Sequence, residues 1–373
     1  MLDQPKVMKE LQESAEQLFM DLSSEFKLAH TVWNSIADDP LFAETIAASR
    51  SPWLIPTWTG LLGTTDTITP TKVEYTVFSV DGSQIYPDRH QGTSCCLINI
   101  GSIALSYGTK TYISLNSTPS IYIPNKHSES ENPVELVNCR RLELELHEGV
   151  IQAQELLQKL PETRVIGMFD GSLIFWHLEG KEEAIQEEFI AKYIQSLHQL
   201  YTLNVPCIGY ISLPHSKELV NLIRMKLADF DPNINKEYKK IEHLLDTHIA
   251  SFFLEPFMRT TFFASNSHII EYYPNHLKPH FFYLNLGQEI VRIELPAWIT
   301  QNATLVNFIC QTLIDQSKKG HGYPVCLAEA HEQAVVKGSD RDFFYHIIQK
   351  IGLEHKQRLY FSQKSLKKRC IGI

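Results

Sequence analysis

The chain has 373 residues, of which 43% are hydrophobic and 21% are charged, and its formal net charge is −9 at pH 7. This composition is that of a globular protein with a sizeable core, and no run of about 18 apolar residues is present to span a bilayer. The negative charge excludes a uniformly basic protein that coats nucleic acid, although it allows a local basic groove.

The cysteines and the amino terminus predict a cytoplasmic protein. The seven cysteines are odd in number and none forms a C-x-x-C pair, so neither a disulfide framework nor a zinc site is expected. The first ten residues lack the basic-then-apolar order of a secretory signal. We therefore expect the cytoplasm, with no membrane partner.

Residues 1–70 predict an amino-terminal helical arm and a connector. Apolar residues recur at mostly three-to-four spacing from about residue 3 to residue 37, which is typical of one long or two shorter amphipathic helices. Residues 50–71 are rich in Pro, Thr, Gly and Trp and show no periodicity, which is typical of a connecting segment.

Residues 75–83, Tyr-Thr-Val-Phe-Ser-Val-Asp-Gly-Ser, predict a buried strand that ends at Asp81 and turns on the glycine. Residues 94–107 predict a long strand interrupted by Gly101, and residues 111–123 hold its hairpin partner and a further short strand. Three consecutive antiparallel strands are therefore expected.

The rest of the chain alternates between helices and strands. Helices are predicted at residues 134–160, 182–203, 217–230, 305–318 and 340–351, and strands at residues 164–170, 206–212, 280–287 and 289–296. This order favours a mainly parallel edge, so the sheet is predicted to be mixed.

The chain after residue 70 is divided into a main domain and a carboxyl-terminal part. The phenylalanine-rich residues 252–263 suggest packed loops or an interface. We assign a main domain to residues 71–340, and a carboxyl-terminal helix with a basic tail to residues 341–373. A solvated terminal face is the simpler interpretation of the tail.

Two aspartates carry the first indication of chemistry. Asp81 and Asp170 each close an apolar run, and Gly-Ser follows each of them. Ligands collect at the carboxyl ends of strands in open α/β sheets, and hard cations such as Mg²⁺ and Mn²⁺ prefer carboxylate oxygens. The pair therefore predicts a divalent-metal site. The alternative is that Asp-Gly is a common turn dipeptide and that both copies are hairpin corners.

Three antiparallel strands, a helix, a strand with a second acid and further αβ units follow the order of a ribonuclease-H-like fold, with a mixed sheet flanked by helices. In that architecture, acids at the end of the sheet bind two metals for phosphodiester cleavage. The residues also resemble the NurA family of DNA-end-processing nucleases from about Thr76 to Val336. The ordered set that carries the resemblance is Asp81-Gly-Ser, Asp88-Arg-His90, Asn99-Ile-Gly, Asp170-Gly-Ser-Leu173, Gly209-Tyr-Ile-Ser212, Gly322-Tyr-Pro324 and Ala328-Glu-Ala-His331.

The resemblance implies a nuclease that depends on Mn²⁺, with Mg²⁺ as the alternative, and that uses two ions. It implies 5′-to-3′ exonuclease and single-strand endonuclease activity on DNA ends and single-stranded DNA in double-strand break repair. It also implies a homodimer that works beside a HerA-type hexameric ATPase that translocates DNA.

Carried over by position, the resemblance assigns Asp81, Asp170 and His331 to the metal site, and Tyr323, eight residues before the histidine, to catalysis. A tyrosine hydroxyl can bind phosphate or order the attacking water, and a neutral imidazole can complete a site that favours Mn²⁺. Taken singly, a histidine on a helix is usually structural, and Tyr323 before Pro324 could be an ordinary turn residue.

The family's intervening glutamate is matched by Glu145, which lies one turn after Arg141 in an Arg-x-x-x-Glu pattern. It is assigned both to the metal site and to catalysis. Glu143 stays open as the alternative, and a glutamate on a charged helix is usually solvated.

Two other functions are compatible with the pattern. The chain could be a catalytically silent protein of this fold that binds DNA ends or a translocase during assembly, because fold does not fix function. A phosphomonoesterase with an aspartyl nucleophile is disfavoured, because neither Asp-Gly-Ser has a second acid two residues further on. Cleavage assays with Mn²⁺ and with EDTA distinguish these functions.

Overall fold

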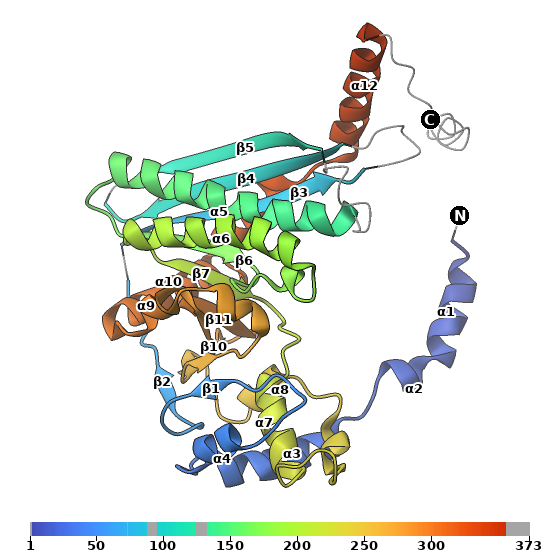
Figure 1. Ribbon diagram of the computed structural model, residues 1–373, viewed down its shortest axis with the longest axis vertical. Helices are drawn as coiled ribbons and strands as arrows, with labels where there is room; N and C mark the ends of the chain where they lie inside the picture. The colour runs from blue at the N-terminus through green and yellow to red at the C-terminus, as the bar shows by residue number, and fades with distance from the viewer. Residues whose placement is uncertain (1, 73, 88–94, 110, 124–132, 356–373) are drawn as a thin grey trace.

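In the part of the chain that the structure describes, eleven strands form one mixed sheet, and helices lie against both of its faces (Figure 1). The computed structural model describes residues 2–72, 74–87, 95–109, 111–123 and 133–355. The predicted motif at residues 88–90 and the basic tail after residue 355 lie outside these residues. Among the described residues, no helix is both long and apolar enough to cross a membrane.

The centre of the sheet has the predicted ribonuclease-H-like order. Strands β3, β4 and β5 form an antiparallel meander, β6 pairs parallel to β3, and β7 pairs parallel to β6. These strands are β3 (Tyr75–Ile85), β4 (Cys96–Tyr107), β5 (Ile113–Tyr122), β6 (Val165–Asp170) and β7 (Cys207–Ile211). The predicted fold class, a mixed sheet flanked by helices, is confirmed.

The remaining strands extend the sheet beyond β7. Strand β11 pairs antiparallel with β7, and β10 forms the predicted hairpin with β11. Four short strands finish this edge, two of them from the segment predicted as a connector. The strands are β1 (Thr57–Trp58), β2 (Thr65–Thr67), β8 (Met258–Thr260), β9 (Phe263–Ala264), β10 (Pro279–Asn285) and β11 (Ile290–Pro296).

Two helical layers bury the faces of the sheet. Alternation along β3 directs Phe78 and Val80 toward one hydrophobic cluster and Tyr75 and Val77 toward another. Helices α5 and α6 cover the first face, and α10 and α11 cover the second (Figure 1). Their bounds are α5 (Pro133–Lys159), α6 (Glu183–Thr202), α9 (Ala297–Thr300), α10 (Ala303–Lys319) and α11 (Val325–Ala334).

A third cluster closes the end of the sheet beyond β10. Helix α3 packs there with α7 and α8, and the rings of Trp33 and Phe253 stack at 4.6 Å. Its helices are α3 (Ser23–Ile36), α4 (Phe42–Ala48), α7 (Glu218–Leu227) and α8 (Asp246–Ala250). The phenylalanines predicted to form packed loops or an interface therefore contribute to packing inside the chain. The predicted boundaries at residues 70 and 340 stay predictions.

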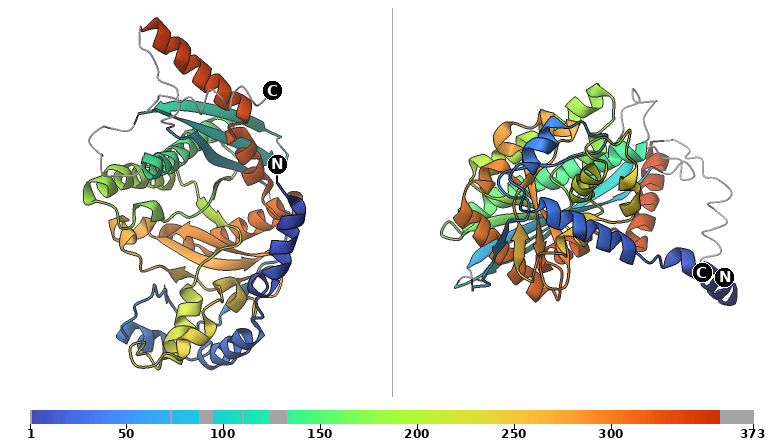
Figure 2. Two further views of the ribbon diagram at one scale, coloured as in Figure 1. Left: turned by 90° about the vertical axis from the view of Figure 1, so that its right-hand side faces the viewer. Right: turned by 90° about the horizontal axis from the view of Figure 1, so that it is seen from below.

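Helices near both ends of the described chain project from this body. Helix α1 (Gln4–Glu13) has no buried residue, and with α2 (Ala15–Leu18) it leads away from the body in Figure 1 and in the right view of Figure 2. Helix α12 (Gly338–Glu354) projects at the end of the molecule that holds β4 and β5 (Figure 1). Short 3₁₀ turns connect other elements: η2 (Trp176–Leu178), η3 (Glu237–Ile241), η4 (His268–Tyr272) and η5 (Asn275–Leu277).

Three local predictions were wrong. Strand β3 does not end at Asp81 but continues to Ile85, and Gly82 is an extended strand residue rather than a turn. Strand β4 passes through Gly101 without interruption. The two runs between residues 111 and 123 form one strand, because β4 is long enough to pair with both of them.

Candidate active site

Asp81 and Asp170 stand side by side where β6 ends. The parallel ladder between β3 and β6 runs from Thr76 paired with Val165 to Val80 paired with Phe169. The two aspartates are the next residues of neighbouring strands, which lie about 4.8 Å apart. The predicted pairing of these two acids at one place in the sheet is therefore present in the structure.

Helix α11 brings His331 to Asp81. Nδ1 of His331 lies 2.8 Å from Oδ2 of Asp81. The carbonyl of Ala334 at the end of the helix accepts hydrogen bonds from Asn99 and Ser83, which belong to β4 and β3. A Cβ atom at Gly101 would lie 2.3 Å from the backbone nitrogen of Ala334, so the glycine permits this close approach.

Helix α5 brings Glu145 to the same place from the opposite face of the sheet. Adjacent residues of a strand face opposite sides, so Asp81 faces α11 while Gly82 faces α5. A Cβ atom at Gly82 would lie 2.5 Å from Oε1 of Glu145. Arg141 donates from Nη1 to the Gly82 carbonyl at 2.9 Å, and its Nε lies 3.4 Å from Oε1 of Glu145.

Glu143, the alternative glutamate, is held elsewhere. It forms an ion pair with Arg140, one turn earlier on α5, and Oε1 lies 3.9 Å from Nζ of Lys192 on α6. Its side chain is only 8% exposed, so these two cations neutralise a buried carboxylate. The structure thus gathers Glu145 with the aspartates and leaves Glu143 between two helices.

Tyr323 reaches Asp170 from the turn between α10 and α11. Gly322 has a φ of +119°, and the hydroxyl of Ser317 donates to its carbonyl, which fixes this turn. The Tyr323 hydroxyl donates a hydrogen bond to Asp170, and its ring contacts Tyr210 edge-on at 5.5 Å. Burial and the neighbouring Asp170 carboxylate raise the pKa of Tyr323, so its hydroxyl keeps its proton.

The gathered carboxylates destabilise one another's charged forms. Burial, with Asp81 and Asp170 nearby, raises the pKa of Glu145 to about 8, although Arg141 opposes the shift. Desolvation and the Asp81 charge also raise the pKa of Asp170, whereas the hydrogen bond from Tyr323 lowers it. Acids that disfavour each other's ionisation in this way form a site that an added cation would stabilise.

The donor set fits a divalent cation, although its side chains do not converge on one point. Among the described residues, no three His, Cys, Asp or Glu side chains are arranged to hold a metal ion. Asp81 contacts His331, and Glu145 contacts Arg141, so a cation would compete with these partners. Carboxylate oxygens with one imidazole are the ligand types of Mg²⁺ and Mn²⁺ sites.

A buried ion pair beneath the Asp170 loop was missed in the sequence. Arg292 and Glu294 lie on β11, and Nε of Arg292 donates to Oε1 of Glu294 at 2.9 Å. The other oxygen of Glu294 accepts from the hydroxyl of Ser172 at 2.7 Å and the amide of Leu173 at 2.8 Å. Two opposite charges two residues apart in the otherwise apolar run 290–296 were the available signal.

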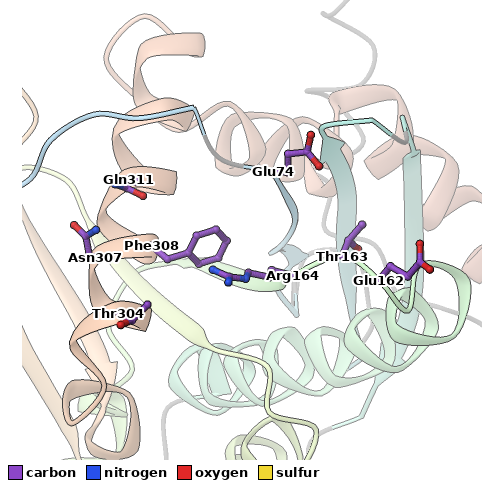
Figure 3. A pocket seen from close by; sticks show the side chains of 8 residues that line it. All are labelled: Glu74, Glu162, Thr163, Arg164, Thr304, Asn307, Phe308 and Gln311. Atoms are coloured by element: carbon purple, nitrogen blue, oxygen red, sulfur yellow. The ribbon is translucent and has the colours of Figure 1, made fainter.

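A different cavity lies at the amino end of β6, away from the gathered acids. It has a volume of about 420 Å³, and Figure 3 shows Arg164 beside Phe308 in it. The Arg164 guanidinium lies 4.9 Å from the centre of the phenylalanine ring. None of the five predicted site residues lines this cavity, so the candidate chemistry belongs to the other end of the strand.

Comparison with known families and structures gives the following relationships. A family model of the NurA domain matches residues 75–336. No curated protein matches the chain. The crystal structure of the NurA nuclease from Sulfolobus solfataricus has a TM-score of 0.50 at 15% identity, with 95% of this chain and 98% of that chain covered.

Two further structures are similar over a large part of the chain. A crystal structure of NurA with manganese has a TM-score of 0.40 at 12% identity and covers 91% of this chain and 98% of its own. The catalytic domain of human endonuclease V has a TM-score of 0.32 at 13% identity and covers 83% of this chain and 95% of its own.

Proposed function

Because the chain belongs to the NurA family, a family of nucleases, we propose that it hydrolyses phosphodiester bonds of DNA with a divalent metal at Asp81, Glu145 and Asp170. The observation that carries this proposal is the meeting of three acids from β3, α5 and β6 at one strand end. Like charges gathered at one place, with the Asp81 and Glu145 side chains only 18% and 12% exposed, have a cost in stability and are typical of functional sites.

Each neighbouring residue has a defined part in this proposal. The three carboxylates and His331 would hold the cation, which would supply positive charge at the phosphate and make the attacking water more acidic. Asp81 orients the imidazole through Nδ1, which leaves Nε2 to bind the cation or accept a proton. Tyr323 keeps its proton and would redirect its single hydrogen bond from Asp170 to a phosphate oxygen or to the attacking water when DNA binds.

The finer activity is proposed from the family. We expect 5′-to-3′ exonuclease and single-strand endonuclease activity on DNA ends during double-strand break repair, in the cytoplasm. We expect two ions and a preference for Mn²⁺ over Mg²⁺, because an imidazole ligand suits Mn²⁺ better.

A homodimer and a HerA-type hexameric ATPase are the proposed partners. The exposed apolar side chains of the amino-terminal arm support a protein contact there, because exposed apolar patches usually mark interfaces. Met8, Leu11 and Phe19 are 64%, 55% and 81% exposed. Light scattering at micromolar concentration tests the homodimer, and a strictly monomeric species with full activity would contradict its place in the mechanism.

Cleavage of labelled oligonucleotides by the purified chain tests the proposed function. We expect cleavage with Mn²⁺, none with EDTA, and none after Asp81→Asn or Asp170→Asn, because the amide keeps the shape but removes the charge. Circular dichroism checks that both variants fold. Full activity in either folded variant would contradict the site. DNA binding without cleavage under any divalent metal would instead support the silent assembly protein.

A further inference from the structure

A second cavity lies beside the loop that follows Asp170, although none of the five site residues lines it. It has a volume of about 450 Å³, and Gly171 and Ser172, the two residues after Asp170, line one side. His215 and Ser216, which follow β7, line the other. Since β6 and β7 are neighbouring parallel strands, the cavity is at the same edge of the sheet as Asp170, about one strand spacing away.

The lining of this cavity suits a flat heteroaromatic group. The half-buried ring of Trp176 forms part of its wall, together with the apolar side chains of Leu54 and Ile211. The hydroxyls of Ser172 and Ser216 add polar atoms at the lining. An aromatic face with nearby hydrogen-bonding groups is how proteins bind unpaired bases.

A chain of hydrogen bonds joins the cavity wall to the Asp170 loop. Nε1 of Trp176 donates to the Ser172 hydroxyl oxygen at 3.0 Å, and the Ser172 hydroxyl donates to Glu294. Glu294 is in turn held by Arg292, and the two side chains are 0% and 3% exposed. The tryptophan and the loop after Asp170 are therefore fixed in one buried frame before any ligand binds.

The charges around the cavity favour a neutral group over a phosphate. Glu218 and Glu294 line it with one guanidinium, that of Arg292, which pairs with both. The ammonium of Lys217 donates to the carbonyl of Glu242 at 2.8 Å and is thus already engaged. Glu218, Glu294 and Arg292 pair with one another and their side chains are 6%, 0% and 3% exposed, so they offer no free positive charge to a phosphate.

We propose that this cavity binds one unpaired nucleobase of the DNA strand, stacked on Trp176, next to the bond that is cut at Asp81 and Asp170. The inference rests on the proposed nuclease function and adds a base-binding site to it. A strand whose phosphate lies over the two aspartates has its neighbouring nucleotide within reach of the cavity. Duplex DNA keeps its bases stacked and paired, so this site favours single-stranded substrates.

A scan of single abasic sites through a single-stranded oligonucleotide tests the proposal. We expect one abasic position, adjacent to the cut bond, to lower kcat/KM with Mn²⁺ by about tenfold or more, since stacking on an aromatic residue contributes substantially per base. In the Trp176→Leu variant, we expect kcat/KM for the intact oligonucleotide to fall by a similar factor. The abasic site at that position should then cause no further decrease. Trp176→Phe keeps a ring and keeps the penalty.

Trp298→Leu is the matched control. It removes another half-buried tryptophan, on α9, which lines a separate cavity with Arg164 at the amino end of β6. We expect the abasic penalty to persist in this variant. No penalty at any position in the unaltered protein, or an equal penalty in folded Trp176→Leu, would overturn the base site.

A measurement without any variant keeps the proposal testable if Trp176→Leu does not fold. 2-Aminopurine at the sensitive position should lose fluorescence on binding to the unaltered protein with EDTA present, and at other positions it should not. Uniform or absent quenching would overturn the proposal. Cleavage without a positional effect would contradict only the base site, whereas absence of cleavage with every divalent metal would contradict the proposed function itself.

Discussion

Gly82→Ala tests whether the glycine in β3, which has no side chain, leaves the space that Glu145 occupies near Asp81 and Asp170. The backbone of Gly82 is extended, so alanine fits its conformation without strain. The added Cβ atom would lie 2.5 Å from Oε1 of Glu145 and 2.7 Å from Cγ of Arg141. Both side chains must therefore move away from β3.

The size of the required movement sets the expected effect. Ordinary van der Waals contact begins at 3.4 Å, so the carboxyl oxygen of Glu145 must retreat by about 0.9 Å. A displacement near 1 Å at reacting groups can lower a rate by about 10²-fold. The contacts are with side-chain atoms that can rotate, so the loss of stability should lie near the lower end of the roughly 1–3 kcal/mol that overpacking costs.

Two quantities are measured for each variant: the rate of oligonucleotide cleavage in the presence of Mn²⁺, and the thermal midpoint of unfolding by circular dichroism. Gly338→Ala is the matched control, because a Cβ atom there has no neighbour within 4 Å. We expect Gly82→Ala to stay folded and lose about two orders of magnitude in kcat. A folded Gly82→Ala protein with full activity would refute the reasoning that Gly82 positions Glu145 for catalysis.

Two further predictions concern the metal preference and the buried acid Asp246. His331→Ala should remove the preference for Mn²⁺ over Mg²⁺, measured as the ratio of the two cleavage rates, and an unchanged ratio would show that the histidine is not a ligand. Burial and the Glu218 charge raise the pKa of Asp246 to about 7, from 3.8. Between these two pKa values, Asp246 is protonated in the folded state and ionised in the unfolded state. The free energy of unfolding should therefore fall as pH rises from about 4 to about 7. Asp246→Asn should flatten this slope in urea unfolding; an equally steep slope in the variant would contradict it.

The sequence predicts the central fold well because its elements follow local rules. Strand and helix periods and their order identify β3 to β7 and the helices between them, with boundaries close to those observed. The continuation of β3 past Asp81 was not predicted, because Asp-Gly usually marks a turn. In this strand the glycine makes room for α5, a contact between residues 59 or more positions apart.

The candidate site could be predicted only as a set of residue types. Asp81 and Asp170 are identified because each closes an apolar run, although β3 continues past Asp81. The choice between Glu143 and Glu145 depends on which way helix α5 faces the sheet. Two residues apart on a helix, these side chains point in different directions. The Arg292–Glu294 pair and the Trp176 cavity arise from packing between β6, β7 and β11, which no local pattern describes.

Glu145→Gln and Glu143→Gln, compared side by side, test the central claim most directly. Both glutamates lie on α5 with side chains only 12% and 8% exposed, and each substitution removes the ability to ionise while it keeps the shape of the side chain. Mn²⁺-dependent cleavage by the two folded variants should differ sharply: Glu145→Gln should be inactive, and Glu143→Gln should keep the activity of the unaltered chain. Full activity in Glu145→Gln would contradict a catalytic centre formed by Asp81, Glu145 and Asp170.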